Sequence, residues 1–228
     1  MKLRRKPIYL LLNFLIVGVL LLSGCEETPK DGEIKKKMVY IEIDNDDGYV
    51  AITPFLSGGV TVVSDQQLVV GLFTSSDYSP DGNNFISRGI FRFNILEWNN
   101  TNITFYLKCI TVKGNPGRLE VYLVDDPGLL TNYFELQDVS PIWNLIESSD
   151  EKIAEITPSE NKWLNVTISK DMVNAVVEER YTNNEYMTFM LKLLHEDLES
   201  YNNYYGFASV DYTPENEDDQ PYLLYEEH

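Results

Sequence analysis

Acidic side chains gather at two turns of the chain, and carboxylate oxygens are the ligands that calcium prefers in proteins. The stretch DNDDG places Asp44, Asp46 and Asp47 beside a glycine turn, and Asp211 precedes a second acidic turn near the C-terminus. If the first and last strands are neighbours, these carboxylates face one cation, and we predict a structural calcium site. A solvated hairpin turn is the alternative, because the acid expected further along a calcium loop is missing.

Residues that catalyse reactions are sparse. His195 and His228 are the two histidines, and no Gly-x-Ser-x-Gly or His-Glu-x-x-His motif surrounds them. Cys109 falls in the apolar register of an alternating run, which is typical of a buried structural thiol. Glycoside hydrolases use two carboxylates at a set separation, and no spacing among the acids singles out a pair. We therefore expect no enzyme, with a polysaccharide lyase or hydrolase as a minor alternative.

A third chemistry is sugar binding, in which aromatic rings cover the ring of the sugar and polar groups bind its hydroxyls. The runs 89–95, 102–112 and 118–124 alternate apolar and polar residues, so each has one polar face. If the three strands pair in succession, their polar faces together present Arg92, Tyr106, Lys108, Glu120 and Tyr122. A second possible platform holds Tyr204 and Trp143. An ordinary amphipathic strand surface is the alternative, because tyrosine is common in strands.

The N-terminal stretch indicates export. A basic start with Lys2, Arg4, Arg5 and Lys6 precedes an apolar run over residues 8–22. This run is short for a spanning helix and suits a signal peptide. It ends in Leu-Ser-Gly-Cys, which resembles the lipobox of exported lipoproteins and makes Cys25 the lipidation site. We expect a signal peptide over 1–24, a lipidated cysteine and polar linker over 25–37, and one domain over 38–228.

Charge and cysteine content narrow the possible partners. The chain carries a net charge of −18, and the predicted signal peptide contains bases but no acid. Nucleic acids and anionic headgroups repel such a chain, so we exclude nucleic-acid binding. Membrane attachment would come from the lipid on Cys25, at the cell membrane or cell surface. Only Cys109 follows Cys25, so no internal disulfide is expected.

The domain reads as short strands separated by turn residues such as Asp-Gly, Asn-Asn and Asn-Pro-Gly. The strands are expected over 38–43, 49–53, 67–73, 89–95, 102–112, 118–124, 152–157, 163–168, 186–194, 205–212 and 221–225. One helix is expected near 170–180, capped by Ser169, with an irregular excursion over 127–148. About ten strands without βαβ spacing indicate an all-β, antiparallel jelly-roll β-sandwich.

Three stretches together resemble one family. They are GIFRFNI (89–95), WLNVTISKDMVNAVV (163–177) and FASVDY with QPYLLYEE (207–212 and 220–227). Their order and spacing resemble the DNRLRE-type domain, a jelly-roll similar to carbohydrate-binding modules in exported and cell-surface proteins. Asn94 stands where the family has Asp. The resemblance implies a lipid-anchored, non-catalytic protein that binds extracellular or cell-envelope polysaccharide. The alternative is a structural or adhesive surface lipoprotein that binds another protein.

Overall fold

The computed structural model describes residues 35–41, 46–53, 58–63, 67–75, 83–96, 98, 100–131, 133–147, 152–180, 186–196, 202–212 and 219–227. Residues 35–228 form one compact unit. Its strands are β1 (Lys35–Tyr40), β2 (Asp47–Ile52), β3 (Gly59–Val63), β4 (Gln67–Ser75), β5 (Asn83–Asn94), β6 (Ile103–Lys113), β7 (Leu119–Val124), β8 (Tyr133–Gln137), β9 (Lys152–Ile156), β10 (Lys162–Ile168), β11 (Tyr186–Leu193), β12 (Asn203–Ala208) and β13 (Tyr222–Glu227). Two helices, α2 (Ser140–Trp143) and α3 (Lys170–Arg180), accompany them.

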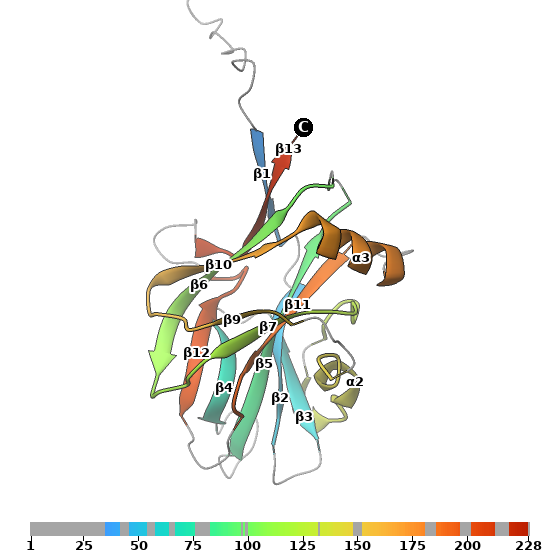
Figure 1. The fold of residues 1–228 in the computed structure, drawn as a ribbon. Coiled ribbons are helices and arrows are strands. Elements are labelled where there is room, and N and C mark those ends of the chain that lie inside the picture. Colours follow the sequence, from blue (N-terminus) through green and yellow to red (C-terminus); the bar gives the residue numbers. More distant parts are fainter. Residues whose placement is uncertain are drawn as a thin grey trace, which may run out of the picture. The chain divides into compact units, whose positions relative to one another are not determined.

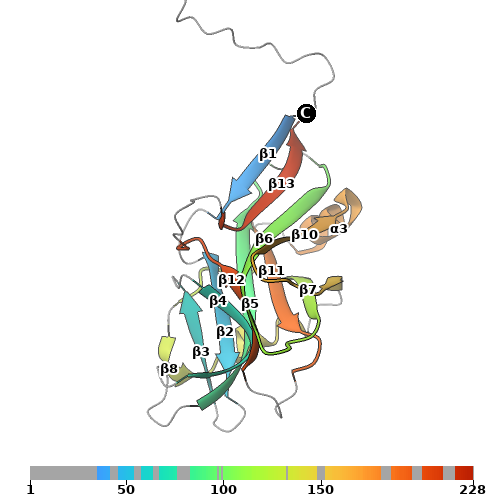
Figure 2. The same cartoon turned by 90° about the vertical axis from the view of Figure 1, so that its left-hand side faces the viewer.

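The strands form one continuous antiparallel sheet that curls onto itself. Its order is β1-β13-β6-β12-β4-β5-β11-β7-β9, while β10 pairs with β6, β2 pairs with β5, and β3 joins β2 to β8. We call β1, β13, β6 and β10 the β6 layer, which Figure 2 shows side by side. We call β2, β5, β11, β7 and β9 the β5 layer (Figure 1). The predicted all-β antiparallel jelly-roll sandwich is confirmed.

Aromatic side chains form the core between the two layers. Phe105 of β6 stacks on Phe189 of β11, with ring centroids 4.5 Å apart. The rings of Phe91 and Phe93 of β5 also contact the Phe105 ring, with centroid distances of 5.6 and 5.7 Å. All four side chains are buried, and each contributes about 1.5–3 kcal/mol by leaving water. The inward positions of β6 are therefore fixed by the core, and the alternate positions must point outward.

Most predicted elements are found, with shifted ends. Helix α3 begins where expected, and Ser169 Oγ accepts the backbone N–H of Met172 at 3.3 Å. Strand β1 begins at Lys35, so the last residues of the predicted linker belong to the sheet. Strands β3 and β8 were not predicted, and α2 lies within the predicted irregular excursion. Cys109 is buried as expected, and burial raises the pKa of its thiol to about 11.

The closing strand joins the two ends of the domain. Strand β13 pairs with β1 on one side and with β6 on the other. Leu223 and Tyr225 point into the core and are buried. The expectation that the first and last strands are neighbours is confirmed, and this pairing brings distant segments of the sequence together on the outer surface of β6.

Candidate functional site

The outer surface of the β6 layer carries a row of aromatic rings from three strands. The register places Tyr222 of β13 opposite Tyr106 of β6 on one side and opposite Tyr40 of β1 on the other. The Tyr106 and Tyr222 rings have centroids 4.7 Å apart, and those of Tyr40 and Tyr222 are 5.7 Å apart. Because Leu223 faces the core, its neighbour Tyr222 faces outward, and the register carries Tyr40 and Tyr106 to the same side.

A tryptophan and a lysine extend this row onto β10. Trp163 is the register partner of Lys108 and lies 5.5 Å from the Tyr222 ring, at 65° to it. The Lys108 ammonium lies 5.5 Å from the Trp163 ring centroid and donates to Asp219 at 3.0 Å. We define Tyr40, Tyr106, Trp163 and Tyr222 as the aromatic row. Tyr40 is 43% exposed, and the other three rings are half-buried.

The geometry determines which parts of the rings a ligand can reach. Tyr106 and Tyr222 are nearly parallel, 9° apart, at about the spacing of neighbouring strands. Their ring planes therefore stand upright on the sheet and present ring edges. Burial and the neighbouring Tyr106 and Tyr40 raise the pKa of Tyr222, so its hydroxyl stays a neutral donor and acceptor. Tyr40, at 47° to Tyr222, and Trp163 are tilted away from this stack. The row offers both apolar ring surface and hydrogen-bonding groups.

The structure separates the residues that were predicted to share one polar face. Tyr106 belongs to the aromatic row and Lys108 lies beside it, but Arg92 and Tyr122 belong to the β5 layer. The assumption of three successive paired strands is wrong, because β11 lies between β5 and β7, and β6 pairs with β10, β12 and β13 instead. Tyr204 pairs with Lys113, which is seven residues or about 23 Å along β6 from Tyr106.

Arg92 occupies a buried ion cluster. Its guanidinium donates to both carboxylate oxygens of Asp126, at 2.5 and 2.9 Å, and also to Asp46. Thr188 donates to Asp126 at 3.2 Å. The Tyr186 ring lies 4.3 Å from the guanidinium carbon. Only 3% of Arg92 is exposed, so its charge is used within the protein, and no surface ligand reaches it.

The four predicted calcium ligands are not all found in one group. Asp46 is ion-paired with Arg92, and Asp44 lies outside the described residues. Asp47 Oδ2 accepts the backbone N–H of Val210 at 2.8 Å, which places the start of β2 beside the turn that contains Asp211. In the ranges described, no three His, Cys, Asp or Glu side chains gather as a metal group would. A calcium site stays a prediction, and melting with and without EGTA tests it.

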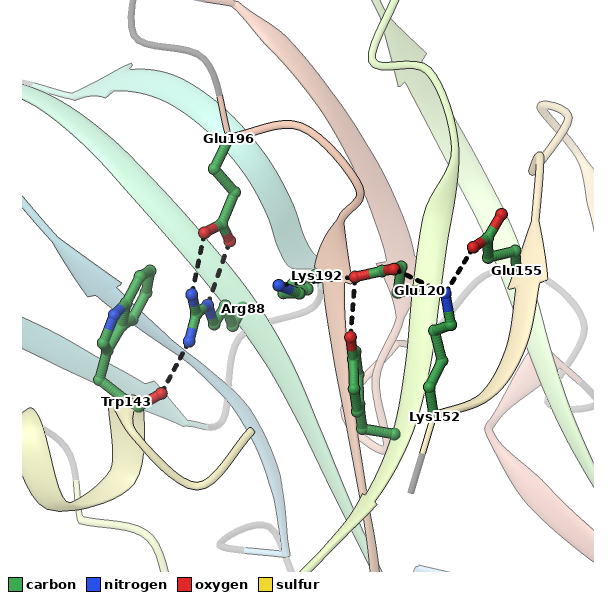
Figure 3. Close-up of polar contacts among 8 residues, drawn as sticks. Arg88, Glu120, Trp143, Lys152, Glu155, Lys192 and Glu196 are labelled. Atoms are coloured by element: carbon green, nitrogen blue, oxygen red, sulfur yellow. Dashed lines mark hydrogen bonds and ion pairs between the residues drawn. The ribbon is translucent and has the colours of Figure 1, made fainter. Parts of the chain in front are cut away.

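Tyr122 belongs to a second polar network, which it forms with Glu120 and Lys152 in the β5 layer. Its hydroxyl donates to Glu120 at 2.9 Å, and Lys152 donates to the same carboxylate at 3.1 Å. Burial and the bond to Glu120 raise the pKa of Tyr122 to about 12. Nearby, Arg88 holds Glu196 through two bonds and donates to the Trp143 carbonyl at 2.8 Å (Figure 3). Each charge here has an opposite charge as its partner, so the network serves stability.

This network makes stability depend on acid pH. Burial by itself would raise the pKa of Glu120, but bonds from Lys152 and Tyr122 lower it on balance, below the ordinary value of 4.5. A depressed folded-state pKa adds stability above the unfolded value, and this is lost as pH falls through the folded value. We expect the free energy of unfolding to fall less on acidification below pH 4.5 in Glu120→Gln than in the wild type. Urea titrations across that range measure it, and equal slopes would contradict the assignment.

One predicted aromatic candidate, Trp143, is not available to a ligand, and three members of the aromatic row were not predicted as site residues. Trp143 is buried, and the guanidinium carbon of Arg88 lies 3.7 Å from the centroid of its ring. It therefore provides no open platform for a ligand. Tyr40, Trp163 and Tyr222 were each placed in a predicted strand but not in a site. Their outward positions follow from alternation, whereas their proximity depends on the β1–β13–β6–β10 pairing, which connects residues far apart in the chain.

Comparisons with known proteins do not assign the chain to a family. No family model matches it, and no curated protein matches it. In the described part of the chain, neither helix is long and apolar enough to cross a bilayer. Cys25 and the predicted signal peptide lie outside the described residues.

Proposed function

We propose that this protein is a non-catalytic carbohydrate-binding lipoprotein. It is exported, held at the cell membrane or cell surface by lipid on Cys25, and recognises extracellular or cell-envelope polysaccharide through the aromatic row. The observation that carries the proposal is the row itself: four partly accessible rings side by side on one sheet surface, with Lys108 and Asp219 at its edge. Aromatic faces and edges cover the apolar C–H groups of sugars, and hydroxyl and charged groups bind sugar hydroxyls.

Two further observations support the proposal. The Leu-Ser-Gly-Cys sequence after the apolar run resembles a lipobox, and the jelly-roll sandwich agrees with the resemblance to DNRLRE-type domains. His195, the one histidine in the described residues, is exposed, and Cys109 is a buried thiol with a raised pKa. A buried thiol with a raised pKa is not activated as a catalytic nucleophile would be.

Truncation of the row tests the proposal. We expect Trp163→Ala to weaken retention on the polysaccharide that retains the wild type by about tenfold or more, because large aromatic side chains dominate binding energy. Affinity electrophoresis against a panel of neutral and anionic polysaccharides measures retention. Tyr204→Ala is the matched control, since it removes a half-buried strand tyrosine away from the row. No retention of the wild type on any polysaccharide would overturn the proposed function.

A specific observation favours protein binding as the second candidate. Met38 and Leu96, exposed by 52% and 65%, border a groove of about 430 Å³ between β1 and the end of β5. Exposed apolar side chains beside a groove are typical of protein contacts. If Leu96→Asp abolishes binding of the protein to whole cells while Trp163→Ala leaves it intact, this second candidate replaces the first.

A further inference from the structure

A polar depression adjoins the aromatic row on the same surface. It has a volume of about 230 Å³ and is lined by Lys36, Asn102, Thr104, Thr167, Leu224, Tyr225 and Glu226. Thr104 lies two residues from Tyr106 on β6, and Leu224 lies two residues from Tyr222 on β13. Residues two apart share a strand face. The depression therefore continues the surface that carries the aromatic row.

Two hydroxyl groups in the depression are available to a ligand. The Thr104 and Thr167 hydroxyls share one hydrogen bond of 3.1 Å across β6 and β10, at an exposed position. A pair of hydroxyls has two donors and four acceptor sites, and this bond uses one of each. Asn102 Oδ1 accepts the backbone N–H of Lys170 at 2.9 Å, which fixes the amide at the rim. Threonine and amide groups of this kind match the hydroxyls of a sugar.

The charges on this surface are already balanced. Lys36 lies opposite Glu226 in the β1–β13 register, and Lys108 is paired with Asp219 at 3.0 Å. The chain as a whole carries a net charge of −18, and such a field repels anionic polymers. The surface therefore suits an uncharged ligand better than a uronate or a sulfated sugar.

The size of the surface sets the length of the ligand. Tyr222, in the aromatic row, and Glu226, at the far side of the depression, are four residues apart on β13, which corresponds to about 13 Å. This span is longer than one pyranose ring. A ligand that contacts both the rings and the threonine hydroxyls must therefore contain several linked sugar units.

We propose that the aromatic row and the polar depression form one extended site for an uncharged, linear oligosaccharide, whose chain lies along β6 and β13. This inference rests on the proposed carbohydrate-binding function and specifies its ligand class. The aromatic row holds one part of the chain by ring contacts, and the Thr104–Thr167 pair binds hydroxyls of the next units.

Isothermal titration with soluble glucan, mannan and xylan oligosaccharides, from disaccharide to hexasaccharide, tests the inference. We expect the hexasaccharide of the preferred series to bind about tenfold tighter than its disaccharide. The double variant Thr104→Val with Thr167→Val keeps side-chain volume and removes both hydroxyls. In it we expect that length advantage to shrink to about twofold, with the disaccharide affinity unchanged. Thr74→Val, at an exposed threonine of β4, is the matched control and should change neither.

The outcomes separate the two proposals. If disaccharide and hexasaccharide bind equally while Trp163→Ala removes both, the row binds sugar and the extended site is wrong. If oligogalacturonate or a heparin fragment binds tighter than every neutral oligosaccharide, the uncharged ligand class is wrong. If no saccharide binds, the proposed function fails, and the extended site fails with it.

Discussion

A chain that lacks residues 221–228 will not fold cooperatively. The deletion removes β13, which supplies the pairing partner of β1 and of the first four residues of β6. It also removes Leu223 and Tyr225, two buried side chains of the core. The edges of two strands and the apolar surface beneath them would meet water together, and this loss is comparable with the usual stability of a whole domain, about 5–15 kcal/mol.

Circular dichroism and thermal melting of the truncated chain measure the effect. We expect no cooperative transition, and a soluble truncation with a sharp transition would contradict the role of β13. Single substitutions in the full chain provide a graded comparison. Leu223→Ala, at a fully buried position, should cost about 2–5 kcal/mol, whereas Leu224→Ala, at a half-buried outward position, should cost clearly less.

The strands that could be predicted are those in which apolar and polar residues alternate along the sequence. In β6 the buried and half-buried positions alternate from Ile103 to Ile110, and the sandwich class follows from several such runs. Strand β3 was missed because all five of its residues, GVTVV, are buried and show no alternation. A short run of this kind without a polar face carries little signal.

The candidate site depended on information that alternation does not contain. Alternation correctly assigns Tyr106 and Lys108 to an outward face, but it does not say which strand lies beside β6. Sequential pairing was the simplest assumption, and it placed Arg92 next to them. In the structure β6 pairs with β10 and β13, and β13 pairs in turn with β1, so the aromatic row is a product of long-range topology.

Charge pairing was equally hidden in the sequence. Asp46 could be read as a metal ligand or as an ion-pair partner, since a carboxylate serves both roles. Its actual partner, Arg92, lies near the end of β5, and the alternation of that strand predicts an outward position for it rather than a buried ion pair. Only the pairing of β2 with β5 brings the two together, and this pairing also explains how a buried arginine is tolerated.

Arg92→Ala will destabilise the domain by about 3–5 kcal/mol, because it leaves Asp46 and Asp126 buried after their cation is removed. Burial alone would lower the pKa of Arg92 and raise that of Asp126, but their attraction shifts both pKa values the other way. Urea unfolding at neutral pH measures the loss. Arg118→Ala is the control, because its pair with Glu155 is exposed and exposed pairs contribute about 0–1 kcal/mol.

The pH dependence of Arg92→Ala and a second variant together distinguish lost charge pairing from lost packing. Without Arg92, desolvation should raise the pKa of Asp126 above its ordinary value of 3.8, so Arg92→Ala should regain stability as pH falls toward 3.8. The wild type, in which Arg92 lowers this pKa, should lose stability as pH falls below 3.8, so the difference between the two should shrink on acidification. Adding Asp126→Asn removes one of the two stranded charges, and we expect the double variant to be more stable than Arg92→Ala at neutral pH. If the double variant is instead less stable by the sum of the single effects, the arginine acts by packing alone, and the ion cluster contributes nothing to the fold.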